Sequence, residues 1–240
     1  RSVTALTNPP DSPNTDGVDI VSSQHISLDH LKLSTGDDDI SIKSGLASAG
    51  NAPASRDITI EDIDVLRGHG VSVGSETANG IGRVTLKDIR FNGTENGLRI
   101  KSGCDRGEGI GPFTADNIRM TGVSVPLVIT DSYGGNGGYS ANSLGVLSPA
   151  AVGRYTPFIH DVTINHLTAS GAKMAGIISG LPEATLRNIR LQNVWISAGH
   201  GLQSRYVSGS RNNVHITTPP HGLPWQQGPE NHWTGQFTAG

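Results

Sequence analysis

The sequence predicts an all-β protein, folded as a single-stranded right-handed parallel β-helix in which successive coils stack into a solenoid. Three observations predict this fold. A six-residue motif recurs along the chain, a short apolar segment rich in glycine follows most copies, and the spacing between copies varies. Glycine is abundant, with 32 residues among 240, while aromatic residues make up 5%, a composition typical of short strands joined by turns.

The repeated motif is an apolar residue, Ser or Thr, an apolar residue or Ala, any residue, Asp, Asn or His, and an apolar residue. Asn or Asp at the fifth position suits a bend between two strands, because its side chain can hydrogen-bond the local backbone. The copies begin at Ile26, Ile58, Val84, Phe113, Val162 and, starting with Ala, Ala184. Each repeat is therefore predicted to form a strand, a tight bend, a strand, a turn and a further strand.

The further strands are predicted in DISIKSG from Asp39, GVSVGS from Gly70, GLRIKSG from Gly97, PLVITDS from Pro126 and GIISG from Gly176. Constant strands with variable turns favour a β-helix over propellers and helical solenoids, which keep a more regular period. A two-sheet sandwich is the alternative, but it would show hairpin signals between adjacent strands. The Asn-Gly pairs at 79–80 and 92–93 fit turns between coils better.

Two segments depart from the repeat. A loop rich in Gly, Ser, Asn and Tyr runs from Asp131 to Pro157, and such long loops are either mobile or functional. After Leu202 the pattern fades, so we expect residues 203–240 to form an irregular C-terminal tail that packs along the solenoid or covers its end.

Charge and composition exclude several classes of partner. The net charge of −3 gives no global attraction for nucleic acid or a membrane, so we expect neither as a partner. The chain has no apolar run long enough to span a bilayer and no signal peptide, which a mature secreted protein would also lack. The single cysteine, Cys104, can form no internal disulfide. We expect a monomer.

Acidic residues form two clusters one repeat apart. Asp16 and Asp19 make the first cluster, and Asp37, Asp38 and Asp39 make the second. Stacking neighbouring coils would bring the clusters together as a two-carboxylate active site. Asp-rich turns at strand ends are the structural alternative, but it explains a single cluster better than a pair.

A histidine and two cations occupy similar places in later repeats. His69 follows Ile58 by the same interval that separates Asp37 from Ile26. Arg99 and Lys101 are two residues apart, so they point to the same side of a strand and could bind a carboxylate. We expect these groups and the aspartates to line one face over about four coils. Such a cleft suggests cleavage of an acidic sugar polymer, although a buried histidine and a solvated strand face are the structural alternatives.

Four of these segments carry a family resemblance. NTDGVD at Asn14, GDDDISIKSG at Gly36, GHGVSVGS at Gly68 and RIK at Arg99 resemble the signature motifs of the polygalacturonase family, glycoside hydrolase family 28. The resemblance covers Asn14 to about Tyr133. It implies a right-handed parallel β-helix that hydrolyses α-1,4 bonds between galacturonic acid units of pectin, with inversion and with no metal or cofactor. It also implies a secreted enzyme whose partner is an acidic polysaccharide.

The resemblance implies a role for each catalytic candidate. Asp37 is expected to be the general acid, while Asp16 and Asp38 activate the water. His69 is expected to support the protonation of the acid. Three close carboxylates cannot all ionise cheaply, so one should keep its proton. For an inverting enzyme the acid and the water-activating carboxylates should lie about 6.5–9.5 Å apart.

Five further residues are implied as substrate contacts. Arg99 and Lys101 would grip the galacturonate carboxylate, and Tyr133 would lie near the cleaved bond. Asn14 and Asp19 would touch the sugar or support the residues that do.

The sequence departs from the family pattern in two ways. Asp39 stands where the family usually has cysteine, and a buried aspartate needs a partner. The family also has earlier coils before the first motif, so we expect residues 1–240 to be one β-helix domain that lacks N-terminal coils.

Other activities stay open at this point. A β-helical pectate lyase would use Ca²⁺ held by aspartates, and a non-catalytic β-helical adhesin or carbohydrate-binding protein would bind without turnover. Within the hydrolase, endo and exo action are not distinguished.

Overall fold

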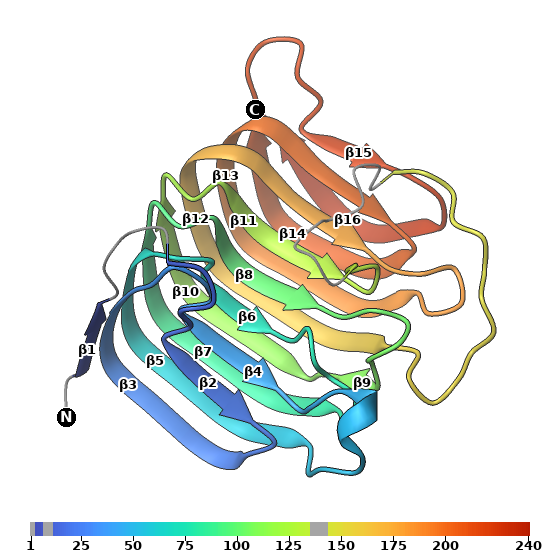
Figure 1. Ribbon diagram of the computed structural model, residues 1–240. Coiled ribbons are helices and arrows are strands. Elements are labelled where there is room, and N and C mark those ends of the chain that lie inside the picture. The colour runs from blue at the N-terminus through green and yellow to red at the C-terminus, as the bar shows by residue number, and fades with distance from the viewer. Residues whose placement is uncertain (1–2, 7–11, 135–143) are drawn as a thin grey trace.

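The chain winds into a solenoid in which strands far apart in the sequence lie side by side (Figure 1). The computed structural model describes residues 3–6, 12–134 and 144–240. All strand pairs in the described residues are parallel. Parallel pairing without hairpins excludes the antiparallel sandwich and supports the predicted coil-on-coil architecture.

Each full coil contributes one long bent strand and one short strand. The bent strands pair in the order β1 (Val3–Leu6), β3 (Gln24–Ser34), β5 (Ser55–Arg67), β7 (Ile81–Asn92), β10 (Phe113–Thr121) and β12 (Phe158–Ser179). The short strands, called here the cleft strands, are β2 (Val18–Val21), β4 (Ile40–Lys43), β6 (Val71–Val73), β8 (Asn96–Lys101) and β11 (Val125–Thr130). β12 is long enough to belong to both rows, because its second half pairs with β11. The minor elements are β9 (Gly109–Ile110) and one 3-10 turn (Ala47–Ala49).

The six-residue motif sets the register of the bent strands. Ile26 pairs with Ile58, Ile58 with Val84, and Phe113 with both Val84 and Val162. The fifth-position residues of these copies all have left-handed backbone, with φ between 48° and 55°; they are His30, Asp62, Asp88, Asn117 and His166. Asn, Asp and His are the residues that tolerate this conformation most readily. The predicted bends are therefore confirmed for the first five copies.

The sixth copy was predicted in the wrong register. Val162 pairs with Ile189 rather than with Ala184, so the sixth coil carries IRLQNV from Ile189, and its bend falls at Asn193 with φ of 51°. Ala184 instead closes a turn, in which its N–H donates to Leu181 O at 3.1 Å. Burial decides the register, because Ile189 and Leu191 are both 0% exposed.

Ladders of apolar side chains fill the inside of the coil. One ladder from the bent strands consists of Ile60, Leu86, Ala115, Ile164 and Leu191. An opposing ladder from the cleft strands consists of Ile42, Val73, Ile100, Ile129 and Ile178. Each of these residues is at most 2% exposed, and burying a large aliphatic side chain stabilises a fold by about 1.5–3 kcal/mol.

The expectation of an irregular tail over 203–240 is wrong. β13 (Leu186–Arg205) is followed by β14 (Val207–Thr217), β15 (Trp225–Gln227) and β16 (Asn231–Ala239), which continue both rows of strands (Figure 1). Trp225 packs edge-on against Trp233 and Phe237, with ring centroids 5.0 and 5.2 Å apart. These rings cover the last coil, which explains why the apolar pattern changes there while the strands continue.

The long loop from Asp131 to Pro157 lies partly outside the described residues, which resume at Leu144. The described part of the loop contacts coils that lie far apart along the solenoid. Leu147 N–H donates to the Tyr206 hydroxyl at 2.9 Å, and the Arg154 guanidinium donates to Asn51 Oδ1 at 2.6 Å. Within the described residues, the structure contains no helix long and apolar enough to cross a membrane.

Candidate active site

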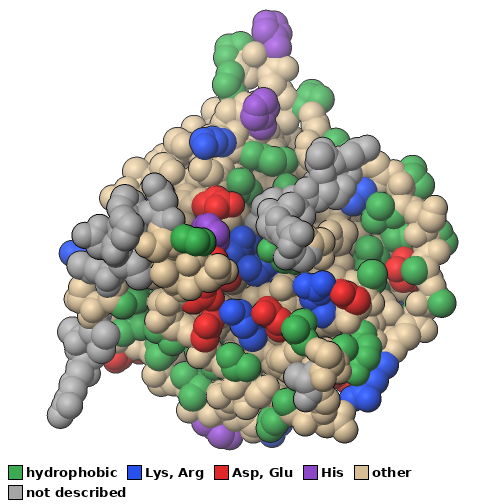
Figure 2. All heavy atoms as spheres, in the orientation of Figure 1, with side chains coloured by type: hydrophobic (Ala, Val, Ile, Leu, Met, Phe, Trp, Pro, Cys, Tyr) green, Lys and Arg blue, Asp and Glu red, His purple; other side chains and the backbone are tan. Residues whose placement is uncertain are grey.

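Charged side chains gather where the cleft strands begin. Figure 2 shows acidic and basic groups beside one another at the centre of this face. Asp16 precedes β2, Asp37 and Asp38 precede β4, His69 precedes β6, and Lys101 ends β8. Parallel strands start at the same edge of a sheet, so three coils place the aspartates and His69 together. Lys101 reaches them from the end of β8 through its long side chain, so four coils contribute to one place, as the sequence suggested.

Arg99 does not occupy the position equivalent to His69. Val71 pairs with both Ile40 and Leu98, while Ser72 pairs with Arg99. Arg99 therefore lies three residues further along its coil than His69 does, which corrects the expected alignment. Its long side chain nevertheless reaches the aspartates.

Asp38 is enclosed by hydrogen-bond donors at the floor of the cleft. Its side chain is 3% exposed. The Ser72 hydroxyl donates to Oδ1 at 2.8 Å, the Lys101 ammonium donates to Oδ2 at 3.0 Å, and the Arg99 guanidinium also donates to Oδ1. Burial opposes ionisation, but Arg99 and Lys101 outweigh it and lower the pKa of Asp38. Asp38 is therefore held as a carboxylate.

Lys101 links this floor to the segment after β11. Its Nζ lies 5.3 Å from the centre of the Tyr133 ring, which places Tyr133 in the site. Burial and the neighbouring Arg99 charge lower the pKa of Lys101. Both cations were expected to grip a substrate carboxylate, whereas in this structure they are directed to Asp38.

His69 bridges two carboxylates at the rim. Its Nδ1 lies 3.0 Å from Asp37 Oδ1, and its Nε2 lies 3.1 Å from Glu95 Oε2. Asp37 Oδ1 also accepts the Asp38 N–H at 2.8 Å. A neutral imidazole can donate from one nitrogen only, so an additional proton is needed to satisfy both contacts. The three side chains line an open depression of about 470 Å³.

A second acidic pair is held by Lys43. The ammonium lies 3.2 Å from Asp16 Oδ2 and 3.1 Å from Asp19 Oδ1, and the Ser41 hydroxyl donates to Asp19. Burial raises the pKa of Asp16; Lys43 partly offsets this, and the Asp19 and Asp37 charges add to it. Burial also acts on Asp19, but bonds from Ser41 and Lys43 outweigh it and lower that pKa. The pKa of Lys43 is raised because bonds to Asp19 and the Asp16 charge outweigh its desolvation.

Asp39 ties together the two turns that carry the catalytic candidates. The side chain is 0% exposed. Its Oδ2 accepts the Gly70 N–H at 3.0 Å, and its Oδ1 lies 3.0 Å from the Thr35 hydroxyl, which also donates to Asp37 O at 2.8 Å. Burial raises the pKa of Asp39 to about 7. The partner that a buried aspartate requires is thus present.

The glycines around His69 are required by close approach. Gly68 and Gly70 have φ of +133° and +85°, which favours glycine. A Cβ on Gly68 would collide with the Asp39 carboxylate, and one on Gly70 would collide with Asn96 O. The GHG pattern therefore lets the His69 turn sit directly against its neighbouring coils.

Sequence reasoning missed Glu95 and Lys43. Asn14, expected to touch the sugar or to support the residues that do, is exposed in the turn before Asp16, with φ of 53°. Lys43 stands in an IKSG segment identical to the one that contains Lys101, which was an available signal. Glu95 lies one coil after His69, and its N–H donates to Gly68 O at 2.8 Å.

Asp37, Asp38 and His69 offer a compact set of ligand atoms. One ligand atom from each of these side chains lies within 4.8 Å of the others. This spacing would suit a metal ion. However, Arg99 and Lys101 already neutralise Asp38, which disfavours a cation there. The separation of about 6.5–9.5 Å between the carboxyl groups of the acid and the water-activating pair stays a prediction.

Comparison with known proteins identifies a family for this chain. Residues 2–201 match the model of glycosyl hydrolases family 28. An endo-polygalacturonase of Pectobacterium parmentieri is 40% identical over 130 residues, covering 54% of this chain and 31% of that protein. A polygalacturonase of Juniperus ashei is 29% identical over 213 residues, covering 86% of this chain and 38% of that protein. The chain thus spans about a third of the length of these relatives.

Solved structures show the same fold. A polygalacturonase from Erwinia carotovora ssp. carotovora superposes with a TM-score of 0.60 at 24% identity, over 99% of this chain and 49% of that one. The family 28 exopolygalacturonase of Yersinia enterocolitica gives a TM-score of 0.74 at 20% identity, over 94% of this chain and 40% of that one. The predicted all-β, right-handed parallel β-helix is confirmed.

The fold and the cleft define a parallel β-helix protein with a carboxylate-rich site of the kind found in glycoside hydrolases. The family match extends over most of the chain. The chain belongs to glycosyl hydrolases family 28, and the resemblance seen in its motifs is confirmed.

Proposed function

We propose that the protein hydrolyses α-1,4 bonds between galacturonic acid units of polygalacturonate, by general acid and base catalysis with inversion. The observation that carries this proposal is that one cleft holds two carboxyl groups, Asp37 and Asp38, with different surroundings. Asp38 is kept ionised by two cations, while Asp37 lies at the rim against His69. A carboxylate held ionised by cations, beside a second carboxyl group that contacts a histidine, gives one site both a base and an acid.

In the proposed reaction Asp37 donates its proton to the glycosidic oxygen as the C1–O bond breaks. A water between Asp16 and Asp38 attacks C1 from the opposite face and transfers a proton to one of these carboxylates. Asp37 then recovers a proton from solvent, and the Asp16 or Asp38 carboxyl that took the proton of the water releases it to solvent. His69, held between Asp37 and Glu95, orients the acid and supplies it with a hydrogen-bond partner.

The cations at the floor have two proposed tasks. Arg99 and Lys101 keep Asp38 ionised, and Lys101 directs one of its three donors to that carboxylate, which leaves donors to bind a galacturonate carboxylate. Tyr133 would pack against the bound sugar beside Lys101. Asn14 and Asp19 would contact the sugar at the Asp16 side. We also propose that the substrate is an acidic polysaccharide and that the enzyme is monomeric and secreted.

The test is release of reducing sugar from polygalacturonate, with and without EDTA, by the wild type and Asp37→Asn. Release that resists EDTA and disappears in Asp37→Asn would support the proposal. Release that EDTA abolishes, with an unsaturated product absorbing in the ultraviolet, would instead indicate a lyase. Tight binding that is unchanged in Asp37→Asn, with no release by either protein, would indicate a carbohydrate-binding protein.

Two further measurements test the roles. Proton NMR of the first-formed product reports whether the anomeric configuration is inverted. Lys101→Ala should weaken use of the polymer much more than it lowers the melting temperature. An equal loss of both would show that Lys101 is structural.

A further inference from the structure

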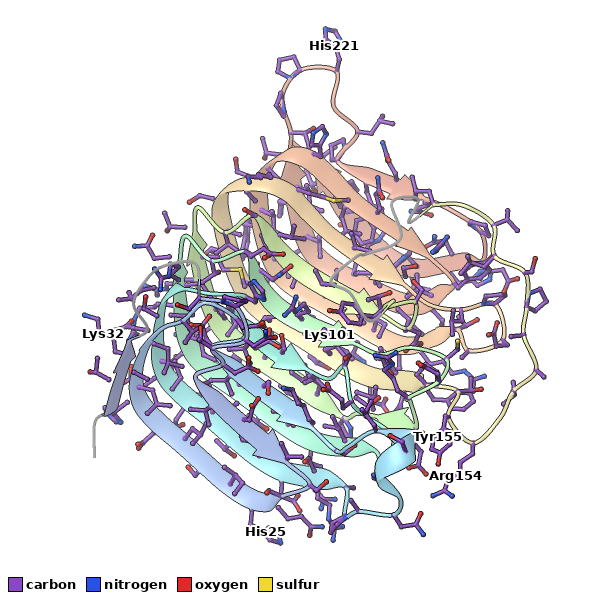
Figure 3. The ribbon with its side chains drawn as sticks, viewed as in Figure 1. His25, Lys32, Lys101, Arg154, Tyr155 and His221 are labelled. Carbon is purple, nitrogen blue, oxygen red and sulfur yellow. The ribbon has the colours of Figure 1, made fainter. Side chains whose placement is uncertain are left out.

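A second groove runs along the outer surface of the bent strands, away from the cleft. Register places one outward residue from each coil in a row parallel to the solenoid axis. The members of this row are Lys32, Asp64, Arg90, Arg119, Thr168, Trp195 and His215. Figure 3 shows Lys32 at the outer edge of the molecule, away from Lys101 at the centre of the cleft face. Depressions of about 360 and 350 Å³ meet at Arg119, Thr168 and Trp195.

Trp195 and His215 form a flat aromatic platform in this row. The rings lie parallel, with an interplanar angle of 4° and centroids 5.7 Å apart, and Trp195 is 40% exposed. Asn213 Oδ1 holds His215 Nε2 at 2.8 Å. One face of the Trp195 ring is covered by His215, so its other face is turned toward Thr168 on the opposite neighbouring strand. The platform is fixed before any ligand arrives.

The short side chain of Thr168 leaves a slot between Trp195 and Arg119. Coils rise by about 4.8 Å, so two coils separate Arg119 from Trp195 by about 10 Å, enough for a sugar ring over Thr168. Arg119 is exposed, and within the described residues it makes no ion pair or side-chain hydrogen bond. Its neighbour Arg90 is instead neutralised by Asp62 and Asp64.

From these observations we infer that the slot binds a uronic acid residue of an acidic polysaccharide, as an anchoring site separate from the cleft. The sugar ring stacks on the free face of Trp195, and the Arg119 guanidinium binds the carboxylate. Hydroxyl groups of Thr121, Ser170 and Ser197 line the same depression and suit sugar hydroxyls. The choice of a galacturonate polymer rests on the proposed function.

The experiment uses tryptophan fluorescence of the Asp37→Asn protein, titrated with a long oligogalacturonate and with a neutral galacto-oligosaccharide of the same length. The acidic oligomer should quench Trp195 and the neutral one should not. Adding Arg119→Ala should weaken the quenching titration about tenfold, because the charge-assisted hydrogen bonds between the guanidinium and the carboxylate are lost. Arg187→Ala, at an exposed arginine of another sheet face, is the matched control and should leave the titration unchanged.

A second readout is independent of Trp195 fluorescence. Trp195→Ala and Arg119→Ala should each reduce retention on a pectate gel, while hydrolysis of a short galacturonate oligomer is unaffected. Superimposable titrations of the parent and Arg119→Ala proteins would overturn the inference, and so would equal quenching by the neutral oligomer. Because binding is measured without turnover, absence of hydrolysis by the wild type would refute the proposed function and leave this result standing.

Discussion

Replacing Asp39 by asparagine tests whether this buried carboxyl is protonated in the folded protein. At low pH a protonated Asp39 can donate from Oδ1 to Thr35 Oγ1, while the Thr35 hydroxyl donates to Asp37 O. The amide of asparagine can reproduce both bonds, since its NH₂ donates to Thr35 and its oxygen accepts the Gly70 N–H. The variant should therefore fold with the site intact.

The magnitude follows from the pKa of Asp39, which burial raises from 3.8 to about 7. A group with a raised folded-state pKa contributes stability below its unfolded pKa, and this contribution is lost as the pH rises through the folded pKa. The shift corresponds to roughly 4 kcal/mol. Asparagine does not titrate, so only the wild type loses this contribution. The unfolding free energy of Asp39→Asn minus that of the wild type should therefore increase by up to about 4 kcal/mol from pH 4 to pH 8.

Urea unfolding followed by circular dichroism at pH 4, 6 and 8 measures this difference. Other titrating groups, including the buried Asp131, whose pKa is raised by burial, are present in both proteins and cancel. Asp105→Asn is the control, because Arg106 lowers the pKa of this exposed carboxyl and the difference should be small and of opposite sign. A difference for Asp39→Asn that stays constant over the range would refute the reasoning.

Three other substitutions test the scaffold and the acidic pair. Gly70→Ala should cost at least about 2 kcal/mol in urea unfolding, because φ is +85° and the new Cβ meets Asn96 O; a cost below 0.5 kcal/mol, in the range of ordinary surface changes, would contradict this. Lys43→Met should move the acidic limb of the pH–rate profile to higher pH, since Lys43 holds down the pKa of Asp16, and an unmoved limb would mean that Asp16 does not titrate in catalysis. Ile60→Ala, at a 0% exposed position, should lower the unfolding free energy by about 2–5 kcal/mol, whereas a smaller loss would show that the ladder collapses around the cavity.

Much of the fold could be predicted because each repeat is determined by residues that are close together in the sequence. Alternating apolar positions and a polar bend residue specify each coil, which is why five copies were placed in register. The sixth copy failed because Thr185 satisfies the motif while Arg190, in the true copy, does not. Pairing with Val162 fixed the register instead, and that is a tertiary constraint.

The site could be predicted as a set of residues but not as a set of contacts. Four coils carry recognisable chemistry, and stacking brings it together. The pairing of His69 with Glu95 and the enclosure of Asp38 depend on side-chain reach across coils, which sequence position does not give. The strands β15 and β16 were missed because Trp225, Trp233 and Phe237 replace the aliphatic pattern there.

The bend residues carry a further consequence. Side chains at the bends, or directly before them, are joined along the axis, with the Asn165 amide donating to Asp116 at 2.9 Å, Asn193 to Asn165 at 3.0 Å and Asn213 to Asn193 at 2.8 Å. Such a seam, parallel to the backbone hydrogen bonds between coils, resists flexing of the rod. The stacked coils that carry the cleft and the outer groove therefore form a rigid scaffold. A bound polymer must adapt its own shape to the spacing between the coils.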